Sequence, residues 1–234
     1  MAGGGWRGVH SEGTAWSTLF GLLFADILIA TPRGVPRRGV FRSDFELAPL
    51  DLCADVFLPR RFGAIASRLD EIRRGGARVI ITHNYGEHYG AALRGVSWTL
   101  LTLEDLQNVA DGLGGSALAH ICALKAEDYG WVAMRCLSFV YLRIRRVARS
   151  AIRLKKFCLR STPTHSNRVA LLRGAWSSGG APDLLLWRLA TAEKGAAAKA
   201  VEVKSRNDTL SDQQRAWLLA LRDAGVTVAV CKVD

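Results

Sequence analysis

The sequence predicts an α/β fold, in which a compact C-terminal core follows a mainly helical region. Two short apolar runs, residues 183–189 and 199–204, are typical of strands, and a Gly-rich turn precedes the first of them. A helix-period segment over residues 210–225 and a strand-like run over residues 226–233 complete the core. This ββαβ order indicates strands packed with helices around one hydrophobic core.

The helix over residues 210–225 has clear boundary signals. Ser211 and Gln214 form an S-x-x-Q capping box at its start, and Gly225 is the expected C-cap. Trp217 and Leu221 lie on its expected buried stripe. We expect Trp187, on the first strand, to pack in the same core.

Four further helices are expected before this core. One covers residues 11–30, with Ser11 as its N-cap and Glu12 in its first turn, where the helix dipole favours a carboxylate. Another covers roughly residues 59–74. The stretch 102–130 reads as two helices separated by two glycines, and Thr102 with Asp105 resembles a capping pair at its start.

A histidine-containing stretch, "THNYGEHYG", lies between these helices. His83, Asn84, Glu87 and His88 together suggest a metal site. The H-x4-H spacing on a Gly- and Asn-containing run is a weak signal, so the stretch is interpreted as a loop.

Charge is concentrated in one segment. The chain has a net charge of +11, which suggests a polyanionic partner, with nucleic acid first. Between Trp131 and Trp176 the sequence contains nine arginines, two lysines and neither Asp nor Glu. That segment accounts for the whole net charge, so the rest of the protein is neutral.

The five cysteines and the hydropathy exclude some protein classes. The cysteines are scattered and none forms a C-x-x-C pair, which argues against a disulfide scaffold or a structural zinc site. No segment reaches about 18 uncharged apolar residues, so we expect no membrane span.

Chemistry is indicated by Glu202 and Lys204 in the triplet "EVK". Residues i and i+2 of a strand project from the same face, so both side chains point the same way. Asp183 lies at the entrance of the preceding strand, directly after Pro182, and approaches Glu202 if the two strands pair. Two adjacent carboxylates repel each other unless a cation lies between them, and Mg²⁺ or Mn²⁺ suits such oxygen ligands.

This "PD…EVK" pattern is the PD-(D/E)xK signature of metal-dependent phosphodiester hydrolysis. The main-chain carbonyl of Val203 would add a metal ligand. Lys204 would hold or help deprotonate the attacking water, or neutralise charge that builds on the phosphate. Taken alone the pattern is a moderate signal. Its place on two consecutive strands followed by a capped helix strengthens it.

Several longer stretches carry a specific resemblance. "GGAPDLLLW" and "AVEVKSRNDTLSDQQRAWLLALRDAGVTVAVCKV" resemble the VRR-NUC domain of the Fanconi-associated nuclease family. "HSEGTAWSTLFGLLFADILI", "LAPLDLCADVF" and "VSWTLLTLEDLQNVADGLGGSALAHICALKAEDY" resemble earlier parts of the same family. The resemblance covers roughly residues 6–130 and 176–234.

The resemblance implies a restriction-endonuclease-like core, a mixed sheet flanked by helices, with a preceding helical region. It implies a 5′-flap endonuclease and 5′-to-3′ exonuclease of the phosphodiesterase I type, which acts in interstrand-crosslink repair in the nucleus and has repair-complex proteins as partners besides DNA. The implied metal ligands are Glu12, Asp183, Glu202 and the main chain of Val203. Lys204 would be the catalytic lysine, and Gln214 would support the site.

Three departures from the family pattern remain. Ser205 and Arg206 stand where the family has Gly-Pro, and Arg206 either contacts phosphate or lies in a surface turn. Family members carry upstream DNA-binding and helical-repeat regions, so we expect weaker substrate handling by this chain alone. An inactive or truncated fragment that only binds DNA or protein is therefore the alternative function.

The third departure is the basic segment, which divides the expected domains into 1–130, 131–175 and 176–234. The segment is either an insertion that grips DNA phosphate or a retained intron translated in frame. The lack of acidic residues and of periodicity favours the second. A spliced transcript lacking codons for residues 131–175 would exclude the DNA-gripping insertion.

Overall fold

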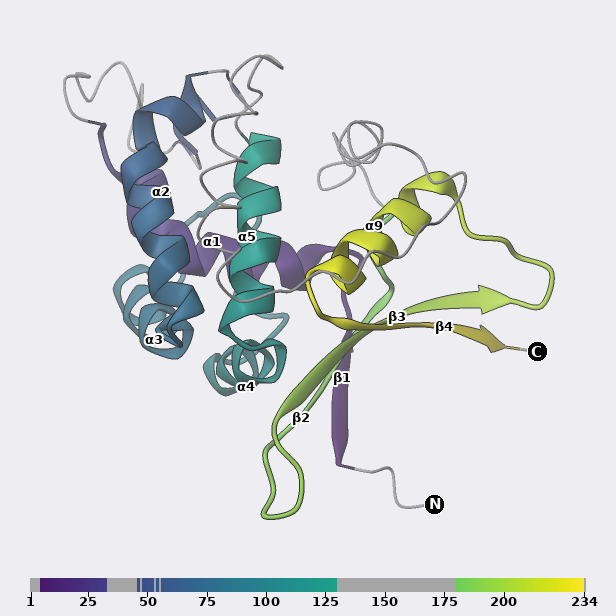
Figure 1. The fold of residues 1–234 in the computed structure, drawn as a ribbon. Helices are drawn as coiled ribbons and strands as arrows, with labels where there is room; N and C mark the ends of the chain where they lie inside the picture. Colours follow the sequence, from purple (N-terminus) through teal and green to yellow (C-terminus); the bar gives the residue numbers. More distant parts are fainter. Residues whose placement is uncertain are drawn as a thin grey trace, which may run out of the picture.

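A computed structural model describes residues 5–32, 46, 48–52, 54, 56–129 and 180–233. The expected domain of residues 131–175 therefore lies outside the described residues. The described helices before residue 130 gather beside a small sheet, and the helix of residues 212–223 lies over another part of that sheet (Figure 1). The elements are β1 (Trp6–His10), α1 (Thr14–Ile29), α2 (Phe57–Arg73), α3 (Ala77–His88), α4 (Leu103–Leu113), α5 (Gly115–Tyr129), β2 (Leu184–Arg188), β3 (Ala197–Ser205), α9 (Asp212–Asp223) and β4 (Thr227–Val233).

The sheet is mixed, in the order β1-β2-β3-β4. β2 is antiparallel to both of its neighbours, whereas β3 and β4 run parallel, with α9 as the connection between them. Leu184 pairs with Val201, so Asp183, one residue earlier, lies at the level of Glu202. The register thus brings the two predicted carboxylates to neighbouring strand ends.

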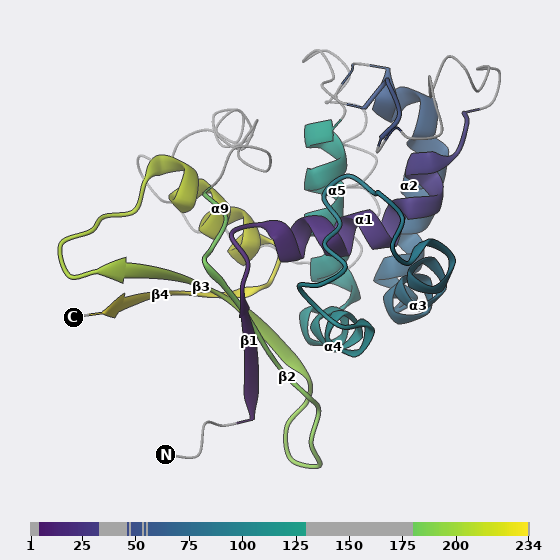
Figure 2. The ribbon, with the colours of Figure 1, turned by 180° about the vertical axis from the view of Figure 1, so that it is seen from behind.

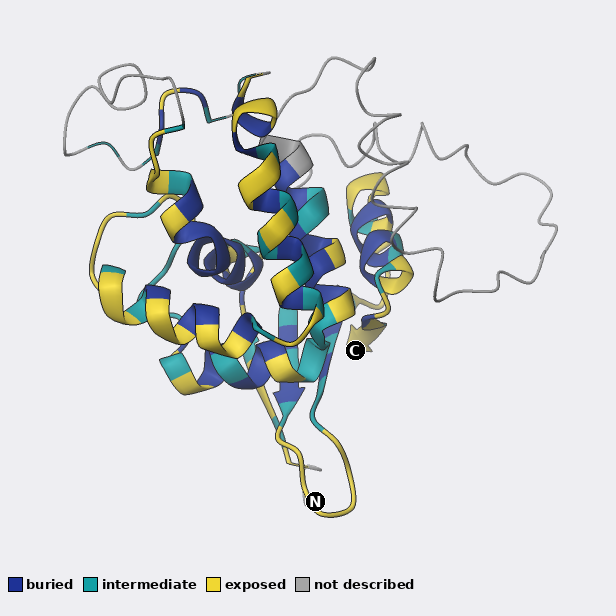
Figure 3. Cartoon of the chain, turned by 60° about the vertical axis from the view of Figure 1, so that its left-hand side comes forward, coloured by how far each residue is buried: buried dark blue, intermediate teal, exposed yellow. Residues whose placement is uncertain are grey.

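One face of the sheet carries the core. Leu185 and Trp187 of β2 and Ala200 of β3 are buried, and the alternation along β2 is that of a strand with one covered face. Trp217 of α9 lies 6.4 Å from Trp16 of α1, measured between ring centroids. Buried residues line the helix and sheet surfaces that meet in this region (Figure 3). Trp187 and Trp217 are core residues, as predicted.

The end of β1 leads directly into α1, which runs from the sheet into the helical group (Figure 2). α1 is buried along most of its length. Its Asp26 pairs with Arg68 of α2, and a hydrogen bond from Asn84 of α3 to the Leu22 carbonyl, 2.7 Å, fixes α3 against it. Among the described helices, none combines the length and apolar character needed to cross a membrane.

The predicted start of the first helix is wrong. The helix begins at Thr14, after an N-cap at Gly13 that has no side-chain hydrogen bond, so Ser11 is not the cap and Glu12 is not in the first turn. Gly13 has φ 94°, a conformation in which glycine is favoured. The chain must turn sharply between β1 and α1, and this turn overrides the capping pattern of the sequence.

The prediction of a loop for the histidine-containing stretch is also wrong, because most of it forms α3. Ile80, Ile81 and Asn84 are buried at helical spacing. Burial of this face outweighs the weak helix preference of Gly86. The only His/Cys/Asp/Glu group within metal-binding reach in the described part of the chain lies elsewhere, so the side chains of α3 form no such cluster there.

The other helix boundaries agree closely with the sequence. Both predicted capping boxes form, with Thr102 and Asp105 on α4 and with Ser211 and Gln214 on α9. α9 ends at the C-cap Ala224, and Gly225 follows it with φ 95°. The N–H groups of Gly225 and Val226 donate to the carbonyls of Arg222 and Leu221, the pattern of a Schellman motif. The C-cap is therefore Ala224, and Gly225, the predicted C-cap, is the residue that follows it.

Candidate active site

Glu202 and Lys204 form the centre of the candidate site. Both project from the same side of β3, and Lys204 Nζ lies 2.9 Å from Oε1 of Glu202. The Glu202 side chain is 1% exposed and that of Lys204 is 13% exposed. A carboxylate this deeply buried is costly without compensating charge, so its position points to a functional role.

Asp183 joins three strands at this point. Its carboxylate Oδ2 accepts a hydrogen bond of 2.7 Å from the backbone N–H of Val203, and its carbonyl accepts one of 2.9 Å from the backbone N–H of Ser11. The first bond ties the start of β2 to β3, and the second ties it to the end of β1. Asp183 is therefore held in place by backbone groups on both sides.

Burial raises the pKa of the Glu202 carboxyl, and the nearby charge of Asp183 raises it further, against the opposing hydrogen bond from Lys204. The same hydrogen bond is the main reason why the pKa of Lys204 is raised, with smaller contributions from the charges of Glu202 and Asp183. The site therefore holds more negative charge than Lys204 alone compensates.

The two oxygens of Glu202 have different surroundings. Oε1 receives Lys204 and also a hydrogen bond from the side-chain amide of Gln214. Oε2 is buried and has no hydrogen-bond partner among the described residues. An unpaired buried carboxylate oxygen beside a second carboxylate is the arrangement that a hard divalent cation satisfies. The residues present therefore fit a Mg²⁺ or Mn²⁺ ion.

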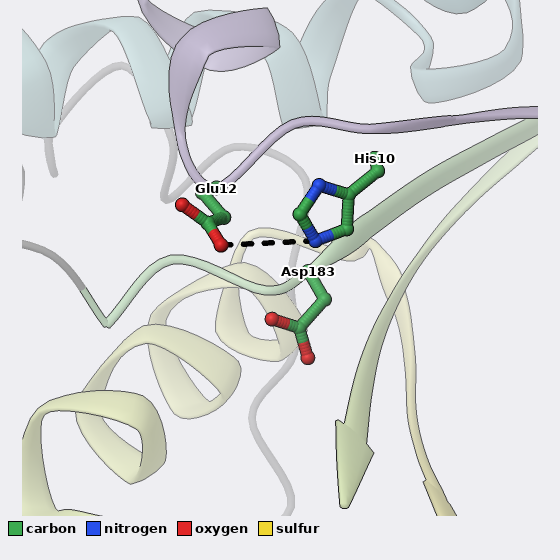
Figure 4. A group of neighbouring side chains, drawn as sticks. All are labelled: His10, Glu12 and Asp183. Carbon is green, nitrogen blue, oxygen red and sulfur yellow. Dashed lines mark ion pairs between the residues drawn. The ribbon is translucent and has the colours of Figure 1, made fainter.

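A second group extends the site toward β1. Ligand atoms of His10, Glu12 and Asp183 all lie within 4.8 Å of one another. The two side chains from the end of β1 and the turn after it converge on Asp183, with His10 Nε2 3.7 Å from Glu12 Oε1 (Figure 4). Both are largely exposed, so they are accessible to an ion and to a substrate.

Glu12 has an unusual backbone conformation, with φ 40°. The left-handed region is uncommon for a residue other than glycine, asparagine or aspartate, and outliers of this kind cluster at functional sites. The turn that holds Glu12 in this conformation also aims it at Asp183. The conformation is consistent with a role of Glu12 in the site.

Residues 164–234 match the family model described as the VRR-NUC domain. A Fanconi-associated nuclease 1 homolog from Arabidopsis thaliana is 37% identical over 99% of this chain and 20% of its own length. Fanconi-associated nuclease 1 from Homo sapiens is 30% identical over 97% of this chain and 18% of its own length. The chain thus spans about a fifth of the length of these relatives.

A solved structure agrees in fold. The crystal structure of paFAN1 bound to DNA with a 1-nt 5′ flap and a gap matches 98% of this chain and 32% of its own chain, with a TM-score of 0.65 and 26% identity. Over this shared region, the chain is similar in sequence and fold to Fanconi-associated nucleases. The mixed sheet with flanking helices is the restriction-endonuclease-like core that the sequence predicts.

Within this family fold, the structure brings together Asp183, Glu202, Lys204 and Gln214. Val203 contributes its N–H to Asp183, and its carbonyl as a metal ligand stays a prediction. Arg206 is exposed in the turn after β3, so it is accessible to solvent and substrate.

His10 is the residue that the sequence interpretation missed. Its only signal is the H-x-E spacing with Glu12. That spacing becomes meaningful only once β1 is known to end beside Asp183.

Proposed function

We propose that this chain is a metal-dependent, structure-specific DNA nuclease. It would cleave 5′ flaps, act as a 5′-to-3′ exonuclease, and serve DNA interstrand-crosslink repair in the nucleus together with repair-complex proteins. The observation that carries the proposal is the buried Glu202, whose Oε2 is unpaired next to Asp183 and Lys204. The nuclease names of the relatives and the flap DNA in the paFAN1 structure support the choice of substrate.

Glu202 through Oε2 and Asp183 would hold Mg²⁺ or Mn²⁺, with Glu12, His10 and the carbonyl of Val203 as further donors. When bound, the ion would supply positive charge for the scissile phosphate and activate the attacking water. Gln214 and Lys204 keep Oε1 of Glu202 occupied, so they orient the carboxylate and direct Oε2 to the ion.

Lys204 has a role that follows from its pKa. In the metal-free site, the hydrogen bond to Glu202 raises the pKa of Lys204, so the side chain is protonated there and is a poor general base. Its ammonium group instead stabilises negative charge that develops on the phosphate. Of the two roles predicted for Lys204, this favours the neutralisation of charge on the phosphate.

Cleavage of a labelled 5′-flap DNA by the purified chain tests the proposal. We expect Mn²⁺-dependent products that disappear with EDTA and with Asp183→Asn, a change that keeps an acceptor for the Val203 N–H. Cleavage that persists under either condition would refute the assigned site. DNA binding without cleavage would instead support the alternative function, an inactive fragment that only binds DNA or protein. That alternative is motivated by the fact that the chain covers only about a fifth of the length of its relatives.

A further inference from the structure

The face of the sheet opposite the core carries a group of aromatic and basic side chains. Trp6 of β1 pairs with Arg188 of β2, and Lys199 of β3 pairs with Leu186, two residues from Arg188. Because successive side chains alternate between faces, Trp6, Arg188 and Lys199 all project from the same face. None of the three belongs to the candidate active site.

The two cations lie over one indole ring. Lys199 Nζ is 4.3 Å from the centroid of the Trp6 ring, and Arg188 Cζ is 5.2 Å from it. Cations at these distances are attracted by the ring's negative face. Trp6 therefore holds two flexible basic side chains side by side.

Among the described residues, neither Arg188 nor Lys199 has a carboxylate partner. Arg7, on the opposite face of the sheet, does have one, because it pairs with Asp105. All three side chains of the group are half-buried, so their outer parts reach solvent. Two uncompensated positive charges held together on an accessible face attract a polyanion rather than an apolar partner. A phosphodiester backbone has the matching charge.

Along β1 this face leads to His10 at the edge of the candidate active site, whereas Glu202 and Lys204 project from the core face with Ala200. His10 projects from β1 on the side of Trp6, four residues further along, which is a distance of about 13 Å. Its ligand atoms reach Glu12 and Asp183. Gly8 lies between Trp6 and His10, and the Leu186 side chain occupies the place where a Cβ of residue 8 would lie. β1 thus raises no side chain between the two ends of this path.

We propose that Trp6, Arg188 and Lys199 form a phosphate clamp that binds the DNA strand about four nucleotides from the His10 end of the candidate site. The spacing follows from about 13 Å of strand and a duplex rise of about 3.4 Å per nucleotide. Arg188 and Lys199 contact backbone phosphates, and Trp6 is a positioning residue that pre-orients them. The clamp rests on the proposed nuclease function, since DNA is its ligand.

The test measures equilibrium binding of the whole chain to a fluorescein-labelled 5′-flap DNA, by anisotropy, over a series of NaCl concentrations in EDTA. Arg188→Gln/Lys199→Gln keeps a polar side chain with two methylenes at each position and removes both charges. Each lost phosphate contact lowers the slope of log K against log salt by about 0.7–0.9, so we expect a decrease of about 1.4–1.8. The matched control, Arg222→Gln at an exposed position of α9, should leave the slope unchanged.

Trp6→Leu separates positioning from charge. Loss of the ring should weaken binding about two- to fivefold, because both cations remain but are no longer held. The salt slope should stay as in the unmodified chain, and Trp6→Phe should restore part of the affinity. Melting curves of each variant show whether the fold is retained.

A double variant with the slope of the unmodified chain overturns the clamp. The binding measurement excludes divalent metal, so it is independent of cleavage. A chain that binds through these residues but never cleaves leaves the clamp standing and removes the nuclease function. If the unmodified chain cleaves but the double variant keeps its salt slope, the clamp is excluded and the nuclease function stands.

Discussion

The side-chain amide of Gln214 donates a hydrogen bond to Oε1 of Glu202. The side-chain oxygen of the same Gln214 accepts a hydrogen bond of 2.9 Å from the backbone N–H of Ser211. One residue therefore caps α9 and fixes the orientation of the buried carboxylate. The helix start and the site depend on each other through this side chain.

Gln214→Ala should reduce cleavage about 10- to 100-fold, the usual effect of removing a residue that orients a metal ligand. It should also cost about 1 kcal/mol of stability through the lost cap. Ser211→Ala is the matched control, because it removes the cap acceptor but leaves the bond to Glu202. Equal losses of cleavage in the two variants would mean that Gln214 acts on the fold alone.

Glu12→Asn should make the metal-free protein more stable and the site weaker. Asparagine tolerates the left-handed conformation that Glu12 adopts at φ 40°, and relief of about 1 kcal/mol corresponds to roughly 2–4 °C in Tm for a chain of this size. The variant should bind Mn²⁺ more weakly by calorimetry. Glu193→Asn, in the exposed β2–β3 hairpin, controls for the charge change. A lower Tm for Glu12→Asn, or undiminished Mn²⁺ affinity, would contradict this account.

His10→Ala should change the preference between metals. An imidazole nitrogen suits Mn²⁺ better than Mg²⁺, so its loss should weaken Mn²⁺ binding about tenfold and Mg²⁺ binding less. His83→Ala, at an exposed position of α3, should change neither. If the ratio of the two affinities stays constant in His10→Ala, His10 is not a ligand.

Metal binding should weaken as the pH falls. The loss of affinity should begin at a higher pH than it would for a metal ligand with the ordinary pKa of glutamate. Glu202 must be ionised to bind a cation, and its pKa is raised above 4.5 by burial and by Asp183. Protons therefore compete for it through that raised pKa, and binding should release protons. Calorimetry with Mn²⁺ in buffers of different ionisation enthalpy measures both effects. An affinity that holds constant down to about pH 4.5 would rule this out.

The parts of the fold set by local signals could be predicted from the sequence. Ser211 with Gln214 and Thr102 with Asp105 fixed two helix starts, because a capping box is a contact between residues three apart. The pairing of Asp183 with Glu202 followed from strand alternation and the short connection between β2 and β3.

Features set by contacts between distant segments could not be predicted. β1 adds to the sheet through β2, which is far away in the sequence, so no local pattern indicates that His10 lies beside Asp183. For the same reason the turn at Gly13 replaced the expected cap at Ser11. The helical conformation of α3 depends on its burial against α1. The glycine and polar residues around Gly86 favour a loop locally, so the sequence pattern alone does not predict this helix.

The central claim is that Asp183 and Glu202 hold one divalent ion between them. Anomalous diffraction from crystals of the chain grown with Mn²⁺ tests it most directly. We expect a manganese peak within coordination distance of the Asp183 carboxylate and of Oε2 of Glu202, with Lys204 still on Oε1. A peak that lies away from Glu202, or an Oε2 paired with a protein donor while the crystals contain Mn²⁺, would contradict it.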